Sequence, residues 1–221
     1  MTADQADLTD VRDMYSVHEG FRRGLRDAPG QVASVRDGET ERALRFADYL
    51  GELLWLLHVH HSSEDELLYP LLVERAPEHR ELFSRMDAQH LAITPSLEAA
   101  QYAAKRFGIT GSVADGRALA DACESLLETL DVHLSQEEEE VLPIAARVIS
   151  PAEWGALPAH ALSQYSGTRV WLPFGLATEA MPADLLEEMR SQLPPPVSAM
   201  WFGGGSDAFA AEMALVRGGT A

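Results

Sequence analysis

Two segments of the chain carry the same arrangement of side chains that bind metal ions. Residues 60–70 read HHSSEDELLYP and residues 133–143 read HLSQEEEEVLP, so that five of the eleven positions are identical at an offset of 73. Each segment places a glutamate four residues after a histidine, Glu64 after His60 and Glu137 after His133. In a helix such residues project from one face, about 6 Å apart along the axis. Each pair can therefore direct an imidazole and a carboxylate at one point.

Two further histidines extend this repeat. Residues 14–25 match residues 86–97 at an offset of 72, which makes His18 the counterpart of His90. The spacing from the single histidine to the paired one is 42 residues in the first half and 43 in the second. The chain is therefore expected to contain two copies of one helical hairpin, related by a pseudo-twofold axis.

Helical periodicity over residues 8–150 predicts the elements that position these side chains. Apolar residues and histidines recur every three or four positions and form one stripe on each segment. Ser112 is a candidate N-cap for the last segment, with Asp115 three residues on. The sequence predicts four long helices, over about Thr9–Asp27, Thr40–Glu74, Glu78–Phe107, and from Ser112 to about 150.

Proline and glycine predict where these helices end or bend. Ala28-Pro29-Gly30 is expected to end the first helix, and Gly108 the third. Pro70 is expected to end or kink the second helix near Tyr69, and Pro95 to kink the third. No run of alternating β-branched residues indicates a strand. Four such helices with short connections favour an all-α, up-down-up-down four-helix bundle over residues 1–150.

The remaining residues, 151–221, have a different composition. They hold 7 of the 12 prolines and three of the four tryptophans. Helices are expected over about Pro151–Ser163, Pro182–Gln192 and Ser206–Arg217, with breaks at residues 193–196 and 203–205. About 70 residues make a marginal core on their own. This segment is therefore expected to be a helical C-terminal cap packed on the bundle.

Composition excludes several classes of function. The chain has 17 basic and 35 acidic residues, a formal net charge of −18, which argues against a nucleic-acid partner and against an anionic membrane surface. The single cysteine, Cys123, excludes an internal disulfide and a cysteine-based metal cluster. The acidic N-terminus does not resemble a signal or transit peptide, and no apolar run approaches the roughly 18 residues of a membrane span. A cytoplasmic protein is expected.

The bundle interior would receive four imidazoles and two carboxylates. Burying them without compensation would be very costly, and a pair of metal cations removes that cost. Each carboxylate can bridge both ions while each ion takes two histidines. Mixed ligands of this kind suit iron or manganese, whereas zinc usually closes at four ligands. Any one of these histidines alone would more often be an ordinary polar residue, but two copies in register favour a dinuclear metal site.

This constellation resembles the hemerythrin-like (HHE) family of non-heme diiron proteins, over about residues 10–146. The resemblance implies two Fe ions joined by an oxo or hydroxo bridge, with manganese or zinc less expected. The metal ligands that it implies are His18, His60, Glu64, His90, His133 and Glu137.

The match to the oxygen-carrying hemerythrins is incomplete. They have a second histidine on the third helix where this chain has Thr94, and an aspartate on the fourth helix where it has Glu138, Glu137 taking that role. The pattern is closer to bacterial HHE proteins and to the iron-sensing hemerythrin-like domain of a ubiquitin-ligase subunit. With four histidines and two bridging carboxylates, the two irons would be nearly equivalent, and each would keep an open position.

Two open positions favour redox turnover over reversible oxygen carriage. The expected partners are dioxygen, peroxide or NO, and the expected function is that of a diiron oxidoreductase, oxygenase or peroxide-handling protein. The alternative is a non-catalytic sensor or binding protein for iron, oxygen or NO. A small organic substrate is indicated if the tail's aromatic residues line a pocket that opens onto the irons. Those residues are Trp171, Phe174, Trp201 and Phe202.

Three other residues have open roles. Tyr15 lies three residues before His18 and is a candidate hydrogen-bond donor to an iron-bound oxygen species, although a packed tyrosine is commoner. His61 points about 100° away from His60, which favours a rim or interhelix position over a switchable ligand. His160 is expected at the surface, with the bundle mouth as the alternative.

Overall fold

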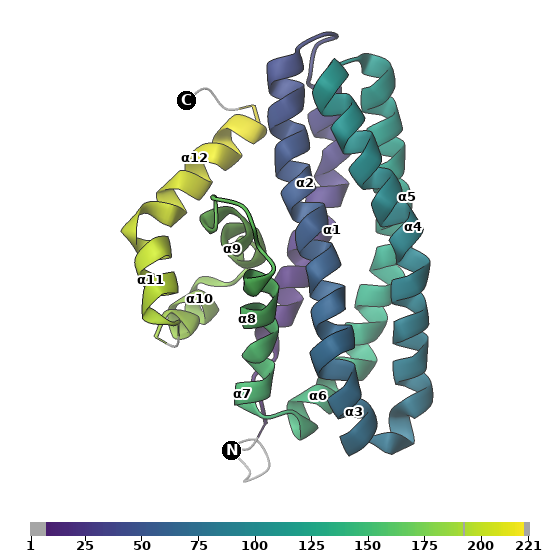
Figure 1. Ribbon diagram of the computed structural model, residues 1–221, viewed down its shortest axis with the longest axis vertical. Helices are drawn as coiled ribbons and strands as arrows, with labels where there is room; N and C mark the ends of the chain where they lie inside the picture. Colours follow the sequence, from purple (N-terminus) through teal and green to yellow (C-terminus); the bar gives the residue numbers. More distant parts are fainter. Residues whose placement is uncertain (1–7, 192, 219–221) are drawn as a thin grey trace.

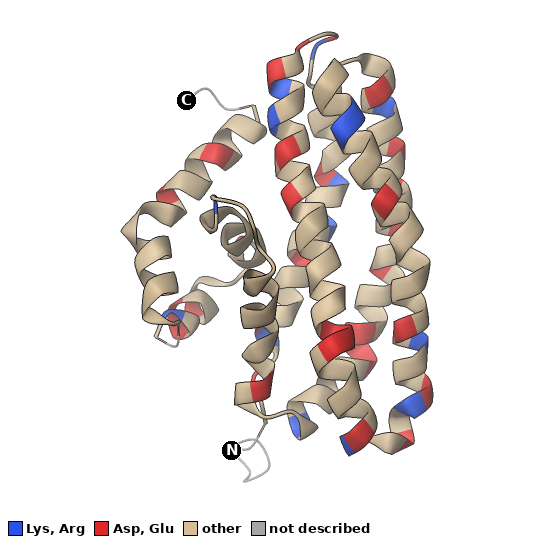
Figure 2. Ribbon diagram, in the orientation of Figure 1, with Lys and Arg blue, Asp and Glu red and all other residues tan. Residues whose placement is uncertain are grey.

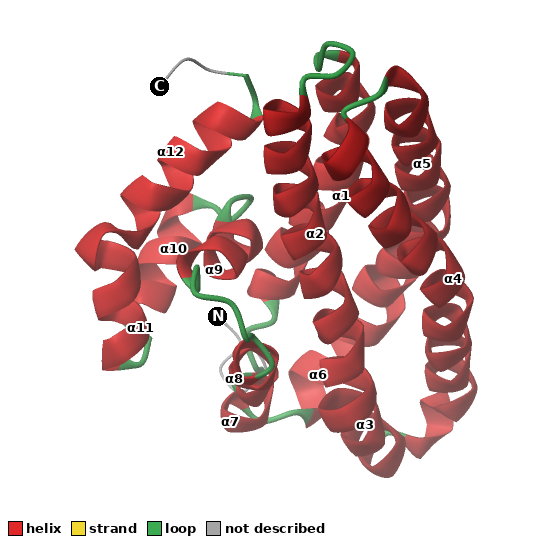
Figure 3. Ribbon diagram, turned by 45° about the horizontal axis from the view of Figure 1, so that its top comes forward, coloured by secondary structure: helices red, strands yellow, loops and turns green. Residues whose placement is uncertain are grey.

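A bundle of four long helices forms the body of the molecule (Figure 1). The computed structural model describes residues 8–191 and 193–218, and none of these forms a strand (Figure 3). α1 and α4 each pack against both α2 and α5, so the four helices close a ring. The all-α bundle expected from the sequence is confirmed. Its helices are α1 (Arg12–Ala33), α2 (Thr40–Ser63), α4 (Arg80–Thr110) and α5 (Val113–Gln136).

Both α2 and α5 continue through a π-helical turn into a short helix. The turns are η2 (Glu64–Leu68) and η4 (Glu137–Val141), and the helices that follow are α3 (Tyr69–Arg75) and α6 (Leu142–Val148). Pro70 and Pro143 stand just after these turns. A proline has no backbone N–H to donate, and its ring clashes with the carbonyl group four residues before it in an α-helix. A wider turn relieves both problems. Such turns are rare and are frequent at functional sites, and here each begins at the glutamate of the repeated motif.

The first helix does not end at Ala28-Pro29-Gly30, as the sequence predicted, but at Ala33. Ala28 is fully buried and Val32 is 8% exposed, so the extra turn adds apolar contacts to the core. Packing therefore overrides the helix-breaking tendency of this tripeptide.

The third long helix, α4, also runs further than predicted. It follows a short 3-10 turn, η3 (Pro77–His79), and passes without interruption through Pro95 and Gly108. A Cβ atom on Gly108 would stand 2.8 Å from that of Ala47, so this glycine permits close approach to α2. The helix ends instead at Gly111, whose left-handed φ of 58° suits glycine at a C-cap. Ser112 then caps α5 as predicted, accepting a hydrogen bond from the Asp115 backbone N–H at 3.1 Å.

The C-terminal segment is a set of short helices along one side of the bundle (Figures 1 and 3). α9 contacts α1 and α2, and α8 contacts α2 and η2. The elements are α7 (Pro151–Trp154), α8 (Ala156–Ser163), α9 (Trp171–Thr178), α10 (Ala183–Arg190), α11 (Pro195–Met200), the π-helical turn η5 (Trp201–Gly205) and α12 (Ser206–Val216).

The sequence missed two of these helices. α9 is almost wholly apolar, WLPFGLAT, and therefore has no amphipathic period to recognise. The predicted break at residues 193–196 is wrong in part, because α11 starts at Pro195 and prolines fit the first turn of a helix. The predicted glycine break at residues 203–205 is confirmed as a kink between α11 and α12, where Gly204 leaves the helical conformation with a φ of 127°. Gln192, the predicted end of one helix, lies outside the described residues. Residues 1–7 also lie outside them, and with them the expectation that the N-terminus is not a targeting segment.

Acidic residues predominate in the bundle. Acidic positions outnumber basic ones along the bundle, and a group of them lies at the level of η2 and η4 (Figure 2). Among the described helices, none combines the length and the apolar character that crossing a membrane requires.

Candidate metal centre

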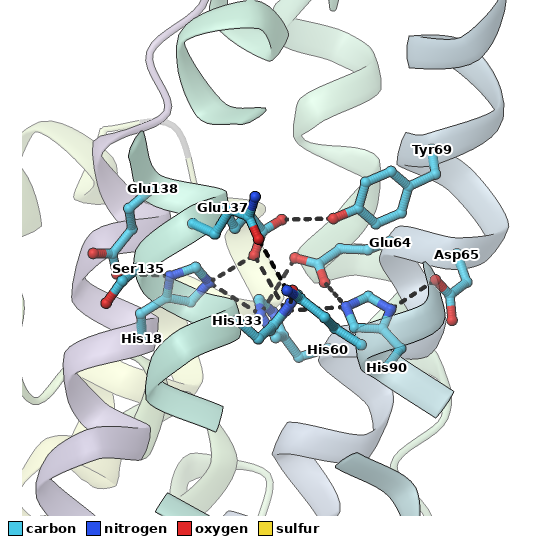
Figure 4. A network of polar contacts seen from close by, with 12 residues as sticks. His18, His60, Glu64, Asp65, Tyr69, His90, His133, Ser135, Glu137 and Glu138 are labelled. Atoms are coloured by element: carbon cyan, nitrogen blue, oxygen red, sulfur yellow. Dashed lines mark hydrogen bonds and ion pairs between the residues drawn. The ribbon is translucent and has the colours of Figure 1, made fainter. Parts of the chain in front are cut away.

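All six predicted ligand residues meet in the bundle interior (Figure 4). Their exposed fractions do not exceed 9%, although all six are polar. The α-helices α1 and α4 supply the single histidines, and the ends of α2 and α5 supply the paired ones. The two glutamates open the π-helical turns. The residues are His18, His60, Glu64, His90, His133 and Glu137.

The imidazoles form two close pairs. His18 Nε2 lies 3.2 Å from His60 Nε2, and His90 Nε2 lies 3.1 Å from His133 Nε2. Two nitrogens bound to one ion at about 2.1 Å and at right angles would be about 3 Å apart. The observed separations fit one metal ion at each pair.

Hydrogen bonds on the far side of the rings determine which nitrogen is free in the second pair. His90 Nδ1 donates to Asp65 Oδ1 at 2.8 Å, and His133 Nδ1 donates to Gln89 Oε1 at 3.1 Å. A neutral imidazole that donates through Nδ1 has only a lone pair at Nε2. When both rings are neutral, two lone pairs face each other at 3.1 Å. A cation between them turns this repulsion into ligation.

Burial keeps the rings of His60 and His133 neutral. It lowers the pKa of His133 to about 2 and lowers that of His60 well below its ordinary value, the neighbouring histidines adding to the effect. A neutral imidazole is the form that binds a metal ion.

Each carboxylate reaches both histidine pairs. Glu64 Oε1 lies 3.3 Å from His60 Nε2, and its Oε2 lies 3.7 Å from His90 Nε2. Glu137 Oε2 lies 3.5 Å from His18 Nε2 and 3.7 Å from His133 Nε2. A bridging ligand between two ions needs this placement.

The same carboxylates are poorly satisfied by the protein itself. Both oxygens of Glu64 and Oε2 of Glu137 are buried without a hydrogen-bond partner among the described residues. Burial raises the pKa of both groups, and the proximity of Glu137 raises that of Glu64 further. Buried oxygens without partners are expensive, and cations supply the missing interactions. The donor set therefore fits a pair of metal ions.

Outer carboxylates orient the single histidines in a symmetric way that sequence reasoning missed. Asp65 accepts from His90, and Glu138 accepts from His18 Nδ1 at 2.9 Å. Arg22 Nη1 holds Glu138 in turn, at 2.6 Å. Each of these acids directly follows one of the two central glutamates, so the repeat itself carried the signal.

This arrangement predicts the effect of one conservative substitution. In Asp65→Asn, the His90 ring loses its charged acceptor and is held less firmly, so metal affinity should fall by about 10- to 100-fold. Competition with a chromophoric chelator measures it. Asp87→Asn, on an exposed face of the same helix as His90, is the control and should bind as the wild type does. Equal affinities in the two variants would contradict the orienting role.

Tyr69, rather than Tyr15, reaches the cluster. The Tyr69 hydroxyl donates to Glu137 Oε1 at 3.3 Å, and its ring is buried. Tyr15 is 42% exposed, and its hydroxyl donates to the backbone oxygen of Glu138 at 3.3 Å, which corrects the expectation for that residue. The repeat offered a signal for Tyr69, because its counterpart at position 142 is leucine.

Two other histidines are placed clearly. His61 occupies the interhelix position rather than the rim, since the side chain is 6% exposed and stacks on His90 of α4 within the cluster. His160 lies beside the cluster, on α8, with Nδ1 3.0 Å from Ser63 Oγ and Nε2 3.4 Å from a Glu66 oxygen. It links the cap to the turn that begins at Glu64.

The aromatic residues of the tail are packed against one another. Phe174 and Trp201 are buried with ring centroids 5.0 Å apart, and Phe202 lies at the surface under Arg190. A cavity of about 390 Å³ lies between α1 and residues 180–185, and none of the four tail aromatics lines it. An organic substrate was expected only if these aromatic residues lined a pocket that opens onto the irons, and this cavity is not such a pocket.

Fold and site together define a helical-bundle protein with a cluster of histidines and glutamates that can hold metal ions. The family model described as the hemerythrin HHE cation-binding domain matches residues 9–145, more than half of the chain. The chain therefore belongs to the hemerythrin HHE family, whose domain implies iron binding. Comparison with curated proteins and with solved structures gave no match.

Proposed function

We propose that this chain is a non-heme diiron protein that reacts with dioxygen, peroxide or NO. His18 and His60 would hold one iron, His90 and His133 the other, with Glu64 and Glu137 bridging. The observation that carries the proposal is that each carboxylate spans both histidine pairs, at 3.3–3.7 Å from their nitrogens.

Iron fits this donor set better than zinc does. Four imidazoles and two carboxylates favour iron or manganese, and zinc sites usually close at four ligands. Membership of the hemerythrin family supports iron. An oxo or hydroxo bridge would complete the pair. Two iron ions in this place supply redox chemistry with small oxidants that no protein side chain provides.

The surrounding residues exclude water, orient the single histidines and hold a proton near Glu137. Burial of the cluster excludes bulk water, and the Asp65 and Glu138 carboxylates fix the single histidines by accepting from Nδ1. The Tyr69 hydroxyl holds a proton 3.3 Å from Glu137 Oε1. Burial and the nearby carboxylates raise the pKa of Tyr69 well above its ordinary value, so that proton stays on the phenol.

The packed tail bears on the substrate. Phe174 and Trp201 belong to the apolar core that includes α1 and α2. This supports a small diatomic or peroxide reactant over an organic one. Residues 151–221 are accordingly proposed to act as a cap on the domain of residues 1–150, and the proposal retains the cytoplasmic location expected from the sequence. A peroxide-handling oxidoreductase is the leading function, and a non-catalytic sensor of oxygen, NO or iron is the alternative.

Addition of hydrogen peroxide to the iron-loaded protein distinguishes the two. A peroxide-handling protein should convert two peroxides into one dioxygen and two waters over many turnovers, measured with an oxygen electrode. The same amount of free iron in buffer without protein, and the iron-free protein without added iron, are the controls. A stable, reversible spectral change without turnover of peroxide would instead support the sensor.

A further inference from the structure

The internal symmetry of the site is broken at one buried position. His61 follows His60, whereas the matching residue in the second half, Leu134, is apolar and fully buried. His61 is 6% exposed, and its Nε2 is buried without a hydrogen-bond partner in the described part of the chain. A polar atom left in this state costs stability that leucine at the same position would not. The Nε2 atom of His61 is therefore available to bind a ligand.

His61 lies with the second pair of histidines. Its ring is stacked on His90 with centroids 4.2 Å apart and planes at 17°, and it meets the edge of His133 at 5.1 Å. One ligand nitrogen from each of these three residues lies within 4.8 Å of the other two. The first pair of histidines forms a separate group of this kind with the two glutamates.

We propose that His61 is a third imidazole ligand of the ion held by His90 and His133. This deepens the proposed diiron function and rests on it. The two ions are then unlike: one has three histidines, and the other, at His18 and His60, has two. The near-equivalence expected from four histidines no longer holds.

Binding requires a small movement of the ring. Two imidazoles on one ion do not lie face to face, so the His61 ring has to leave its stack on His90 by turning about the Cβ–Cγ bond. That torsion has a broad energy profile in histidine, so turning the ring about it costs little.

The inequality of the ions decides where an external ligand binds. Three imidazoles, two bridging carboxylate oxygens and a bridging oxygen fill six positions on the His61 ion. The ion at His18 and His60 receives one ligand fewer and keeps an open position. A small anion such as azide should therefore bind with a stoichiometry of about one per pair of irons.

The test compares His61→Leu with wild type and with His58→Leu. Leucine is the residue that the repeat itself places at position 134, and His58 lies on the exposed side of the same helix. Wild type and His58→Leu, loaded with iron, should give two Mössbauer doublets of equal area. His61→Leu should give one merged doublet or lose an ion, with an affinity for the second ion at least about tenfold weaker.

Failure of this inference is distinguishable from failure of the proposed function. If wild type binds no iron, the diiron function falls. If wild type binds two irons and His61→Leu has the same doublets and affinity, only the role of His61 falls. Pulsed EPR of mixed-valent wild type counts bound imidazoles without any variant, so poor folding of His61→Leu does not affect it. Five imidazoles support the proposal and four overturn it.

Discussion

Replacing Glu137 with alanine should empty both metal sites. Its Oε2 lies 3.5 Å from a nitrogen of one histidine pair and 3.7 Å from a nitrogen of the other, at His18 and His133. The substitution therefore removes a ligand from each ion and one of the two links between them. Iron content after reconstitution and gel filtration should fall from about two per chain to well below one.

A neighbouring acid provides the control for this experiment. Glu139 is two residues further along the same turn and is exposed. Glu139→Ala removes one negative charge from the same surface without touching the cluster, so its iron content should equal that of the wild type. If the two variants retain iron equally, the six-residue centre is not where the metal binds.

Removing iron from the wild-type protein should lower its melting temperature substantially. An ion that binds only the folded state, present at about 1,000 times its dissociation constant, stabilises that state by about 4 kcal/mol. For a chain of this length that corresponds to roughly 8–16 °C. Calorimetry before and after chelation measures the difference. The chelator should not shift the melting of Glu137→Ala, which is the matched control.

The fall in melting temperature on iron removal should become larger as the pH rises. In the iron-free protein burial raises the pKa of Glu64 and of Glu137 above the ordinary value of 4.5. Above pH 4.5 the unfolded chain has lost these protons while the iron-free fold retains them, so these two carboxyl groups destabilise the iron-free fold as the pH rises. The buried His60 and His133 are neutral with and without iron, so their lowered pKa values do not change the difference between the two forms. In the loaded protein both carboxylates are ionised and bound. The difference in melting temperature should therefore widen from pH 5 to pH 8, and a constant difference would contradict this account.

The repeat was sufficient to predict that these six side chains meet in one buried cluster, since it placed the same residue types in the same register twice. It was insufficient for the residues that break the symmetry. His61 was expected at the rim or between helices because it points about 100° from His60, and that direction did not decide between the two. However, the direction that His61 takes from α2 faces α4, where its ring stacks on that of His90. Helical direction alone cannot tell solvent from a neighbouring helix.

The positions where helices end could not be predicted from local sequence signals either. The tripeptide at Pro29 and the glycine at position 108 are local stop signals, but each lies where continuing the helix brings apolar side chains or a neighbouring helix into contact. α9 escaped prediction because burial on all sides removes the alternation that marks an amphipathic helix.

The central claim is that the protein holds two irons in one bridged pair. The most direct test is low-temperature Mössbauer spectroscopy of wild-type protein reconstituted with ⁵⁷Fe, together with the iron-to-protein ratio. The account predicts about two irons per chain in a coupled, diamagnetic diferric pair. A ratio near one, or two irons that behave as isolated paramagnetic ions, would contradict it.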